Sequence, residues 1–218
     1  MSVLRIPTRF TRRFGVRYPF AGAGMVFAPP TPDRAIAVSN AGGIGSLAVG
    51  CTPPEQLRTY IRAIRGATSE PFNVNFITCF DNDGAVRVCA EEGVPIVSFH
   101  WGHPRAEQIR VLRDACVSIW EQVASVEAAR IAIGDGAELV ITQDQEIGGH
   151  KRSSQPTFAL LQSIVDAVGK DALVLASGRI SDDVGIAAAF ALGADAVRLG
   201  VRVGTQLVTK PSCNAIRS

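Results

Sequence analysis

Residues 148–150 place two glycines directly before a histidine, just beyond an apolar run that ends at Thr142. The connecting segment reads QDQEIGGH (143–150). Paired glycines let the main chain approach a ligand closely or adopt a positive φ angle, and an imidazole can take up a proton near neutral pH. We therefore expect Gly148 to lie beside a bound ligand and His150 to act as a general base. A surface turn that happens to carry a histidine is the alternative.

Glycines also follow the last two apolar runs of the chain, in ASGR (176–179) and RLGV (198–201). Main-chain amides beside such glycines can hold a phosphate, particularly where a helix begins just beyond, as Ile180-Ser181-Asp182 predicts. We expect a phosphate site at Gly178 and Gly200. Tight packing inside the protein is the alternative explanation for these two glycines.

Two further histidines, His100 and His103, occur in SFHWGHP (98–104), after the fourth apolar run. His100 ends that run and is a candidate for contact with a substrate, with structural packing as the alternative. A metal site built on both histidines would need another ligand, and the neighbouring sequence offers no clear one. We therefore expect no metal.

The elements that must position these residues are short apolar runs alternating with helical patterns. The runs cover residues 19–25, 44–49, 72–78, 96–99, 117–123, 139–142, 173–176 and 196–201. Strands that alternate with helices form parallel sheets, and eight such repeats predict a closed (β/α)8 TIM barrel whose active site lies at the carboxyl ends of the strands. An open doubly wound sheet is the rival, but the prolines in GMVFAPP (24–30) do not suit its glycine-rich dinucleotide turn.

The end of the chain departs from this pattern. Residues 204–218 contain Pro211 and no apolar stripe. We therefore expect a single domain, residues 1–218, whose barrel lacks the final closing helix, as in a C-terminally truncated barrel. A homo-oligomer in which a second copy covers the open seam would compensate for that loss.

The composition excludes several other classes of protein. With 47% hydrophobic residues in 218, the chain can bury one sizeable core. Its net charge of +2 is too small to argue for nucleic acid, and no apolar run reaches the roughly 18 residues that span a membrane. Five cysteines without a CxxC pair indicate neither disulfides nor zinc, so a reduced, cytoplasmic setting is expected. One basic cluster near the start is typical of a solvated face or tail; it comprises Arg5, Arg9, Arg12, Arg13 and Arg17.

Together, the motifs resemble those of the nitronate monooxygenase family, formerly called 2-nitropropane dioxygenases, which are FMN-dependent barrels. The resemblance spans nearly all of the chain, and the combination of motifs is more specific than any one of them. It implies an enzyme that oxidises alkyl nitronates with molecular oxygen and releases nitrite and a carbonyl product. The matching stretches are RYPFAGAGM (17–25), AVSNAGGIGSLAVG (37–50), PFNVNF (71–76), VSFHWGHP (97–104), QDQEIGGH (143–150), TFALLQSIVDAVG (157–169) and GIAAAFALGADAVRLG (185–200).

The same resemblance implies roles for individual residues. FMN would supply the redox chemistry, while the protein would supply orientation and a base, His150. Main-chain amides of Gly178, Gly200 and Val201 would hold the FMN phosphate. Further contacts with FMN would come from Ala23, Gly24, Met25, Asn75, Gln143 and Gly148.

Two positions depart from the family pattern at the phosphate site. Arg179 stands where a second glycine is usual, and Val201 where threonine is usual. We hypothesise that the Arg179 guanidinium grips the phosphate directly, as a fork of donors. The hydroxyl missing at Val201 should weaken phosphate binding by about 1 kcal/mol.

Two other functions fit the same residues. One is an FMN-dependent NADH:quinone reductase or enoyl-thioester reductase, whose motifs are similar. The other is a truncated barrel that has lost catalysis and acts as a binding module, which Arg179, Val201 and the missing closing helix would favour.

Overall fold

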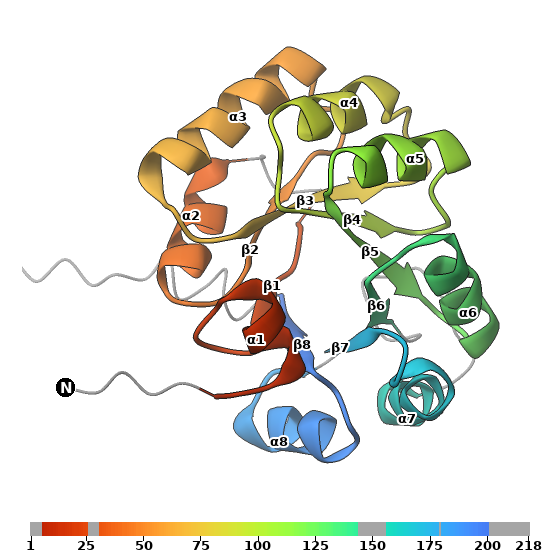
Figure 1. Cartoon of the computed structure of the whole chain (residues 1–218). Coiled ribbons are helices and arrows are strands. Elements are labelled where there is room, and N and C mark those ends of the chain that lie inside the picture. Colours follow the sequence, from red (N-terminus) through yellow and green to blue (C-terminus); the bar gives the residue numbers. More distant parts are fainter. Residues whose placement is uncertain (1–5, 26–30, 144–155, 179, 201–218) are drawn as a thin grey trace, which may run out of the picture.

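The computed structural model describes residues 6–25, 31–143, 156–178 and 180–200, and within them eight parallel strands alternate with helices (Figure 1). All eight predicted strands are confirmed. The strands are β1 (Phe20–Gly22), β2 (Gly45–Ala48), β3 (Phe72–Ile77), β4 (Ile96–His100), β5 (Ser118–Val123), β6 (Leu139–Thr142), β7 (Leu173–Ser177) and β8 (Ala196–Leu199). The helices are α1 (Arg9–Phe14), α2 (Pro32–Asn40), α3 (Pro54–Ala67), α4 (Asp83–Glu91), α5 (Ala106–Asp114), α6 (Val126–Asp135), α7 (Thr157–Val168) and α8 (Asp183–Ala191).

The sheet closes on itself. Its strands follow the order β1-β8-β7-β6-β5-β4-β3-β2, and a bridge between Ala21 and Ile44 joins the two ends. Gly22 N donates to Ile44 O over 2.9 Å, and Ile44 N donates to Phe20 O over 3.0 Å. The predicted (β/α)8 barrel is thus confirmed, and the open doubly wound alternative is wrong. The predicted absence of a closing helix after β8 concerns residues 201–218, which lie outside the described residues.

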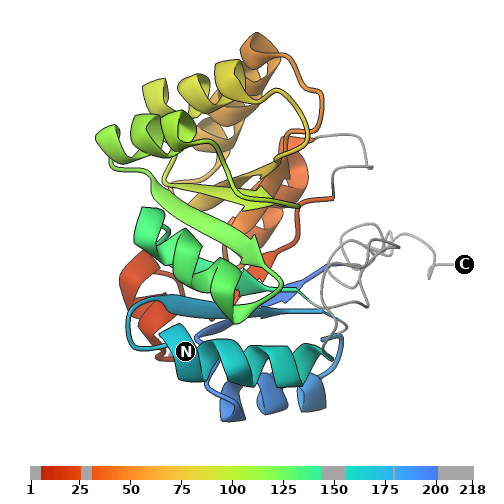
Figure 2. The same ribbon diagram turned by 90° about the vertical axis from the view of Figure 1, so that its right-hand side faces the viewer.

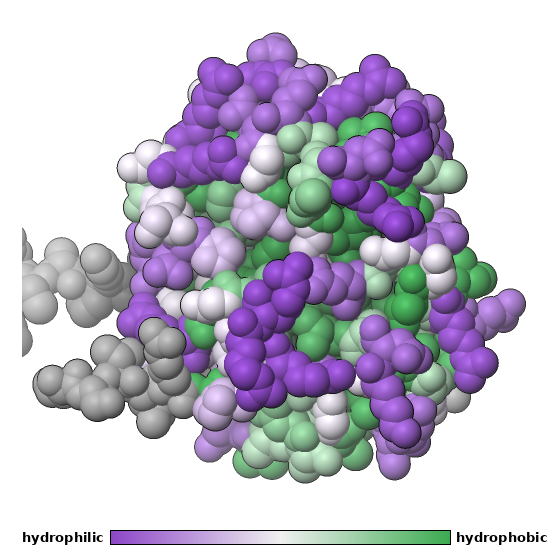
Figure 3. Space-filling view, viewed as in Figure 1, coloured by the Kyte–Doolittle hydropathy of each residue, from purple (hydrophilic) through white to green (hydrophobic). Residues whose placement is uncertain are grey.

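Side chains of each strand alternate between two buried regions. Those that point outward, such as Val74, Phe99 and Val140, pack against the surrounding helices. Those that point inward near the start of the strands, such as Ile96 and Trp120, form a separate apolar cluster inside the barrel. The helices expose polar outer faces, which Figure 3 shows as the hydrophilic surface over α3, α4 and α5. None of the helices in the described ranges is both long and apolar enough to cross a membrane.

Helix α1 closes the amino-terminal end of the barrel. The ring of Phe10 is fully buried and lies 5.7 Å from that of Trp120, measured between centroids. A capping box starts this short helix, because Thr8 and Thr11 each accept a hydrogen bond from the other's main-chain N–H. The apolar pattern of the sequence does not predict α1.

The arginines of the basic cluster help to fasten this segment. Arg9 pairs with Asp195 at 2.6 Å, and Arg13 forms an ion pair with Glu138. Both side chains remain about half exposed, as expected for a solvated face. The segment is nevertheless a docked helix and not a free tail.

At the opposite end, the inward-facing positions become polar. Asn75, Ser98, His100 and Arg198 occupy the carboxyl halves of β3, β4 and β8. Figure 2, in which the strands run from left to right, shows the carboxyl ends gathered on one side of the molecule. We call this end the barrel mouth. The change from apolar to polar side chains along the barrel places the chemistry-bearing residues there.

Candidate active site

Three side chains from three strands meet inside the barrel mouth. Arg198 of β8 donates from Nη1 to Nε2 of His100 on β4, over 2.6 Å, and from Nη2 to Oδ1 of Asn75 on β3, over 3.0 Å. Asn75 is fully buried and His100 is 5% exposed. Arg198 therefore reaches across the barrel to the strands on its far side.

A chain of buried hydrogen bonds inside the barrel fixes the side chain of Asn75. Asn73 Nδ2 donates to Ser98 Oγ at 2.8 Å and to Ser46 Oγ at 3.0 Å, and Ser98 Oγ donates to Asn75 Oδ1 at 3.2 Å. Ser46 Oγ in turn donates to the carbonyl of Gly22 at 2.6 Å. With its oxygen receiving two donors, Asn75 has its orientation set, and its Nδ2 is left as a buried donor without a partner within the described structure. An unpaired buried donor costs roughly 1–3 kcal/mol, so this amide is poised to meet a ligand.

The main chain at the end of β1 lies directly against this amide. A Cβ atom at Gly24 would fall 2.6 Å from Asn75 Cγ and 2.8 Å from Nδ2, distances that real side chains do not adopt. Ala23 N donates to Leu199 O over 2.9 Å, which extends the contact between β1 and β8 to the rim. Ala23, Gly24 and Met25 are all partly exposed there. Glycine at position 24 therefore keeps the contact with Asn75 free of a side chain.

The two ionisable side chains at the barrel mouth, His100 and Arg198, differ in charge at neutral pH. Burial, and secondarily the charge of Arg198, hold the pKa of His100 well below its ordinary value of 6.5. The ring is therefore neutral and can accept the hydrogen bond from Arg198. Burial lowers the pKa of Arg198 to about 10, so this side chain is still protonated at neutral pH. No carboxylate of the described residues forms an ion pair with it.

The tips of β6, β7 and β8 supply the remaining predicted residues. Gln143, directly after β6, is 8% exposed, and its N–H donates to Val123 O over 3.1 Å. Gly178, directly after β7, has a φ angle of +120°, which favours glycine. Among the described residues, the atom nearest to a Cβ at Gly200 would be Ala23 Cβ, at 3.8 Å.

The structure thus brings eight predicted site residues to one end of the barrel. They are Ala23, Gly24, Met25, Asn75, His100, Gln143, Gly178 and Gly200. Four other predicted residues, Gly148, His150, Arg179 and Val201, lie outside the described residues.

Arg198 had no predicted role. It occurs as the one charged residue within the apolar strand Ala196–Leu199. Along this strand, the alternation of inward and outward positions puts Arg198 on the same side as Ala196, which belongs to the cluster inside the barrel. The sequence signal for a role of Arg198 was therefore a charged residue at a strand position whose side chain points into the barrel.

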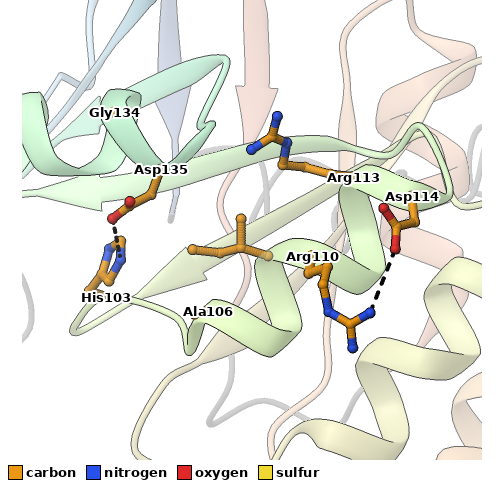
Figure 4. A pocket seen from close by; sticks show the side chains of 8 residues that line it. His103, Ala106, Arg110, Arg113, Asp114, Gly134 and Asp135 are labelled. Atoms are coloured by element: carbon orange, nitrogen blue, oxygen red, sulfur yellow. Dashed lines mark ion pairs between the residues drawn. The ribbon is translucent and has the colours of Figure 1, made fainter.

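His103 lies apart from this site. His100 faces the barrel interior, whereas His103 contacts two carboxylates outside it: Nδ1 lies 3.0 Å from Glu121 Oε1, and Nε2 lies 3.1 Å from Asp135 Oδ2. Figure 4 shows His103 and Asp135 facing each other beside a cavity of about 510 Å³, which residues of α5 and α6 line. The two histidines therefore cannot share a metal ion.

Known proteins of similar sequence show which family this chain belongs to. The family model described as "Nitronate monooxygenase" matches residues 8–84 and 78–215. The chain belongs to the nitronate monooxygenase family. A nitronate monooxygenase from Pseudomonas aeruginosa is 31% identical in an alignment 239 residues long, gaps included. The alignment covers 88% of this chain and 67% of that protein. A (3aS,4S,5R,7aS)-5-hydroxy-7a-methyl-1-oxo-octahydro-1H-indene-4-carboxyl-CoA dehydrogenase from Mycobacterium tuberculosis is 32% identical, with 91% of this chain and 56% of that protein covered.

Solved structures agree with this assignment to the nitronate monooxygenase family. FabK from Thermotoga maritima superimposes with a TM-score of 0.85 at 40% identity, covering 91% of this chain and 62% of FabK. A nitroalkane oxidase from Streptomyces ansochromogenes gives a TM-score of 0.77 at 30% identity, covering 85% of this chain and 65% of that protein. The chain thus spans roughly three fifths of the length of several of its relatives.

Proposed function

We propose that this chain is an FMN-dependent oxidoreductase that oxidises alkyl nitronates with molecular oxygen, releasing nitrite and a carbonyl product. Membership of the nitronate monooxygenase family supports this proposal. The observation that carries it is the barrel mouth, where cationic Arg198 and the unpaired Asn75 amide lie beside the bare main chain of Gly24. Such a mouth suits a ligand that is rich in acceptors and negatively charged.

The residues present fit a flavin. The unpaired Nδ2 of Asn75 can donate to a carbonyl of the ring system, and Gly24 lets the main chain after β1 pack directly against that amide without a side chain between them. The amides near Gly178 and Gly200 lie at the tips of β7 and β8, where barrels of this class often hold phosphate. Bound FMN would supply the redox chemistry.

Other roles in the proposal rest on the sequence. His150 is the proposed catalytic base and Gly148 a proposed neighbour of the flavin, while Arg179 and Val201 belong to the proposed phosphate site. His100 stays a proposed contact of the substrate, although its Nε2 is already engaged by Arg198. A homo-oligomer and a cytoplasmic setting also remain predictions, and light scattering tests the first of them.

The test begins with the colour of the protein. The purified chain should bind FMN, either as isolated or after reconstitution, and show the visible spectrum of a flavoprotein. With propionate 3-nitronate and air, it should consume oxygen and release nitrite. A protein that binds FMN yet releases no nitrite from nitronates would refute the proposed reaction. A protein that cannot bind FMN would favour the binding-module alternative.

A second candidate function is a flavin-dependent reductase that uses NADH. It is favoured by the 40% identity with FabK, an enoyl-ACP reductase, which exceeds the 31% identity with the nitronate monooxygenase from Pseudomonas aeruginosa. Anaerobic mixing with NADH separates the two functions. Rapid bleaching of the flavin without a nitronate would support the reductase, whereas the proposed monooxygenase should retain its colour.

A further inference from the structure

The positive charge of Arg198 has no counter-charge in the described part of the chain. Its two hydrogen-bond partners, the ring of His100 and the amide oxygen of Asn75, are both neutral. A charge removed from water normally has a counter-charge or a ligand to compensate for its lost hydration. Arg198 is partly exposed at the barrel mouth, so a bound anion can reach it and would supply the counter-charge that the described residues lack.

The position of the guanidinium separates it from the predicted phosphate site. In the sheet, the main chain of Arg198 pairs with Ala21 of β1 and Ser177 of β7. Its guanidinium extends away from these neighbours to Asn75 on β3 and His100 on β4. The charge consequently lies within the barrel, whereas the tips that carry Gly178 and Gly200 form its rim.

Further donors remain at this point. An arginine side chain carries five N–H groups, of which the contacts with His100 and Asn75 engage one from each terminal nitrogen. The amide Nδ2 of Asn75 is a second, unpaired donor beside the guanidinium. A planar fork of donors matches a planar anion whose charge is shared by two oxygens, such as a nitronate or a carboxylate.

We propose that Arg198 and Asn75 form the subsite that binds the planar oxyanion of the substrate. Arg198 supplies the charge. Asn75 Nδ2 carries two N–H groups, of which one would serve the oxyanion and the other the proposed flavin contact. His100 is a positioning residue that orients the guanidinium. The identity of the anion as a nitronate rests on the proposed function, but the subsite itself does not. Removing Arg198 should therefore weaken anion binding whichever reaction the protein catalyses.

Nitrate serves as the probe, because it is a planar oxyanion that needs no turnover. Nitrate is titrated into the full chain by calorimetry at constant ionic strength, with and without FMN. We expect saturable binding that Arg198→Gln weakens at least about tenfold and Asn75→Leu weakens severalfold. The control Arg110→Gln removes an exposed charge on α5 and should leave nitrate binding unchanged.

Two outcomes would overturn the subsite. The first is a wild-type protein that binds no nitrate, and the second is Arg198→Gln binding nitrate as the wild type does. If Arg198→Gln fails to fold, nitrate binding is measured for Arg198→Lys and Asn75→Leu. Unchanged nitrate binding in both variants would also refute the subsite. A loss of nitronate turnover with intact nitrate binding would instead count against the proposed function alone.

The flavin itself is the other source of a planar anion at this site. Its reduction potential is measured for the wild type and for Arg198→Gln, each loaded with FMN. If the substrate subsite is correct, the substitution should weaken nitrate binding at least about tenfold, while the potential of the bound flavin changes little. A clear fall in the potential with nitrate binding preserved would assign the charge of Arg198 to the flavin and overturn the proposal.

Discussion

The guanidinium of Arg198 and the imidazole of His100 form a hydrogen bond of 2.6 Å that joins β8 to β4 inside the barrel. The imidazole accepts this bond, so it is held neutral by its own structural role as well as by burial. A histidine fixed in this way is suited to orienting a neighbour and poorly suited to taking up a proton. Proton abstraction is therefore better assigned to another group, in agreement with the prediction for His150.

His100 should not titrate in the physiological range. Because burial and Arg198 lower its pKa well below 6.5, we expect its ring nitrogen signals in NMR spectra to stay constant from pH 8 to pH 5. In the unfolded chain the same ring takes up a proton near pH 6.5, so acid favours unfolding. The stability of the His100→Gln variant should accordingly fall less steeply than that of the wild type as pH drops below about 6.5. A ring that titrates with a midpoint near 6.5 in the folded protein would contradict this assignment.

Gly24→Ala should impair flavin binding. The new Cβ would fall 2.6 Å from Asn75 Cγ and would displace the amide that we expect to meet the flavin. We expect FMN affinity to fall by at least about tenfold, or roughly 1.4 kcal/mol, in a titration followed by flavin fluorescence.

Gly66→Ala is the matched control for that substitution. Gly66 lies in α3, and a Cβ there would meet no atom of the described residues within 4 Å. Its FMN affinity should equal that of the wild type, with stability unchanged or raised by up to about 1 kcal/mol. Equal FMN affinity in the Gly24 and Gly66 variants would show that the flavin does not depend on the Asn75 amide.

Phe10→Ala should strongly destabilise the barrel. Phe10 is fully buried against Trp120 and Phe14, and removing such a ring costs about 3–5 kcal/mol. Urea denaturation measures the loss. Phe158→Ala, at a ring that is 38% exposed on α7, should cost much less. If the two variants lost similar stability, α1 would not be part of the cooperative fold.

Glu121→Gln should change how stability depends on pH. Burial raises the pKa of Glu121, which contacts His103. The folded protein therefore binds the proton of this carboxyl more tightly than the unfolded chain does, and wild-type stability falls as pH rises above about 4.5. Gln cannot ionise, so the variant does not lose this stability as pH rises. Its melting temperature relative to that of the wild type should therefore increase from pH 4 to pH 7. A difference that does not vary with pH would contradict the expected ionisation.

Much of the fold followed from local patterns in the sequence. Short apolar runs alternating with helical stripes were enough for all eight strands and for barrel closure. Helix α1 was missed because it has only six residues, four of them arginine or threonine, and its apolar face is made of Phe10 and Phe14 alone. Its stability comes from packing against Trp120, a contact across more than a hundred residues.

The candidate site was predictable only in part. Glycines such as Gly24 and Gly178 mark strand ends in the sequence, so their location at the mouth was foreseeable. The contacts of Arg198 were not, because periodicity shows which way a side chain points but not which strand it reaches across the barrel. His103 illustrates the same limit, since its partners Glu121 and Asp135 belong to β5 and α6.

The packing of Phe10 against Trp120 has a kinetic consequence. Since these rings close the amino-terminal end of the barrel, reactants are expected to reach the polar interior from the carboxyl side. We expect two bulky reactants that use this mouth to occupy it one after the other, so that the first product departs before the next large molecule enters. Steady-state rates measured against two such reactants should give parallel double-reciprocal lines.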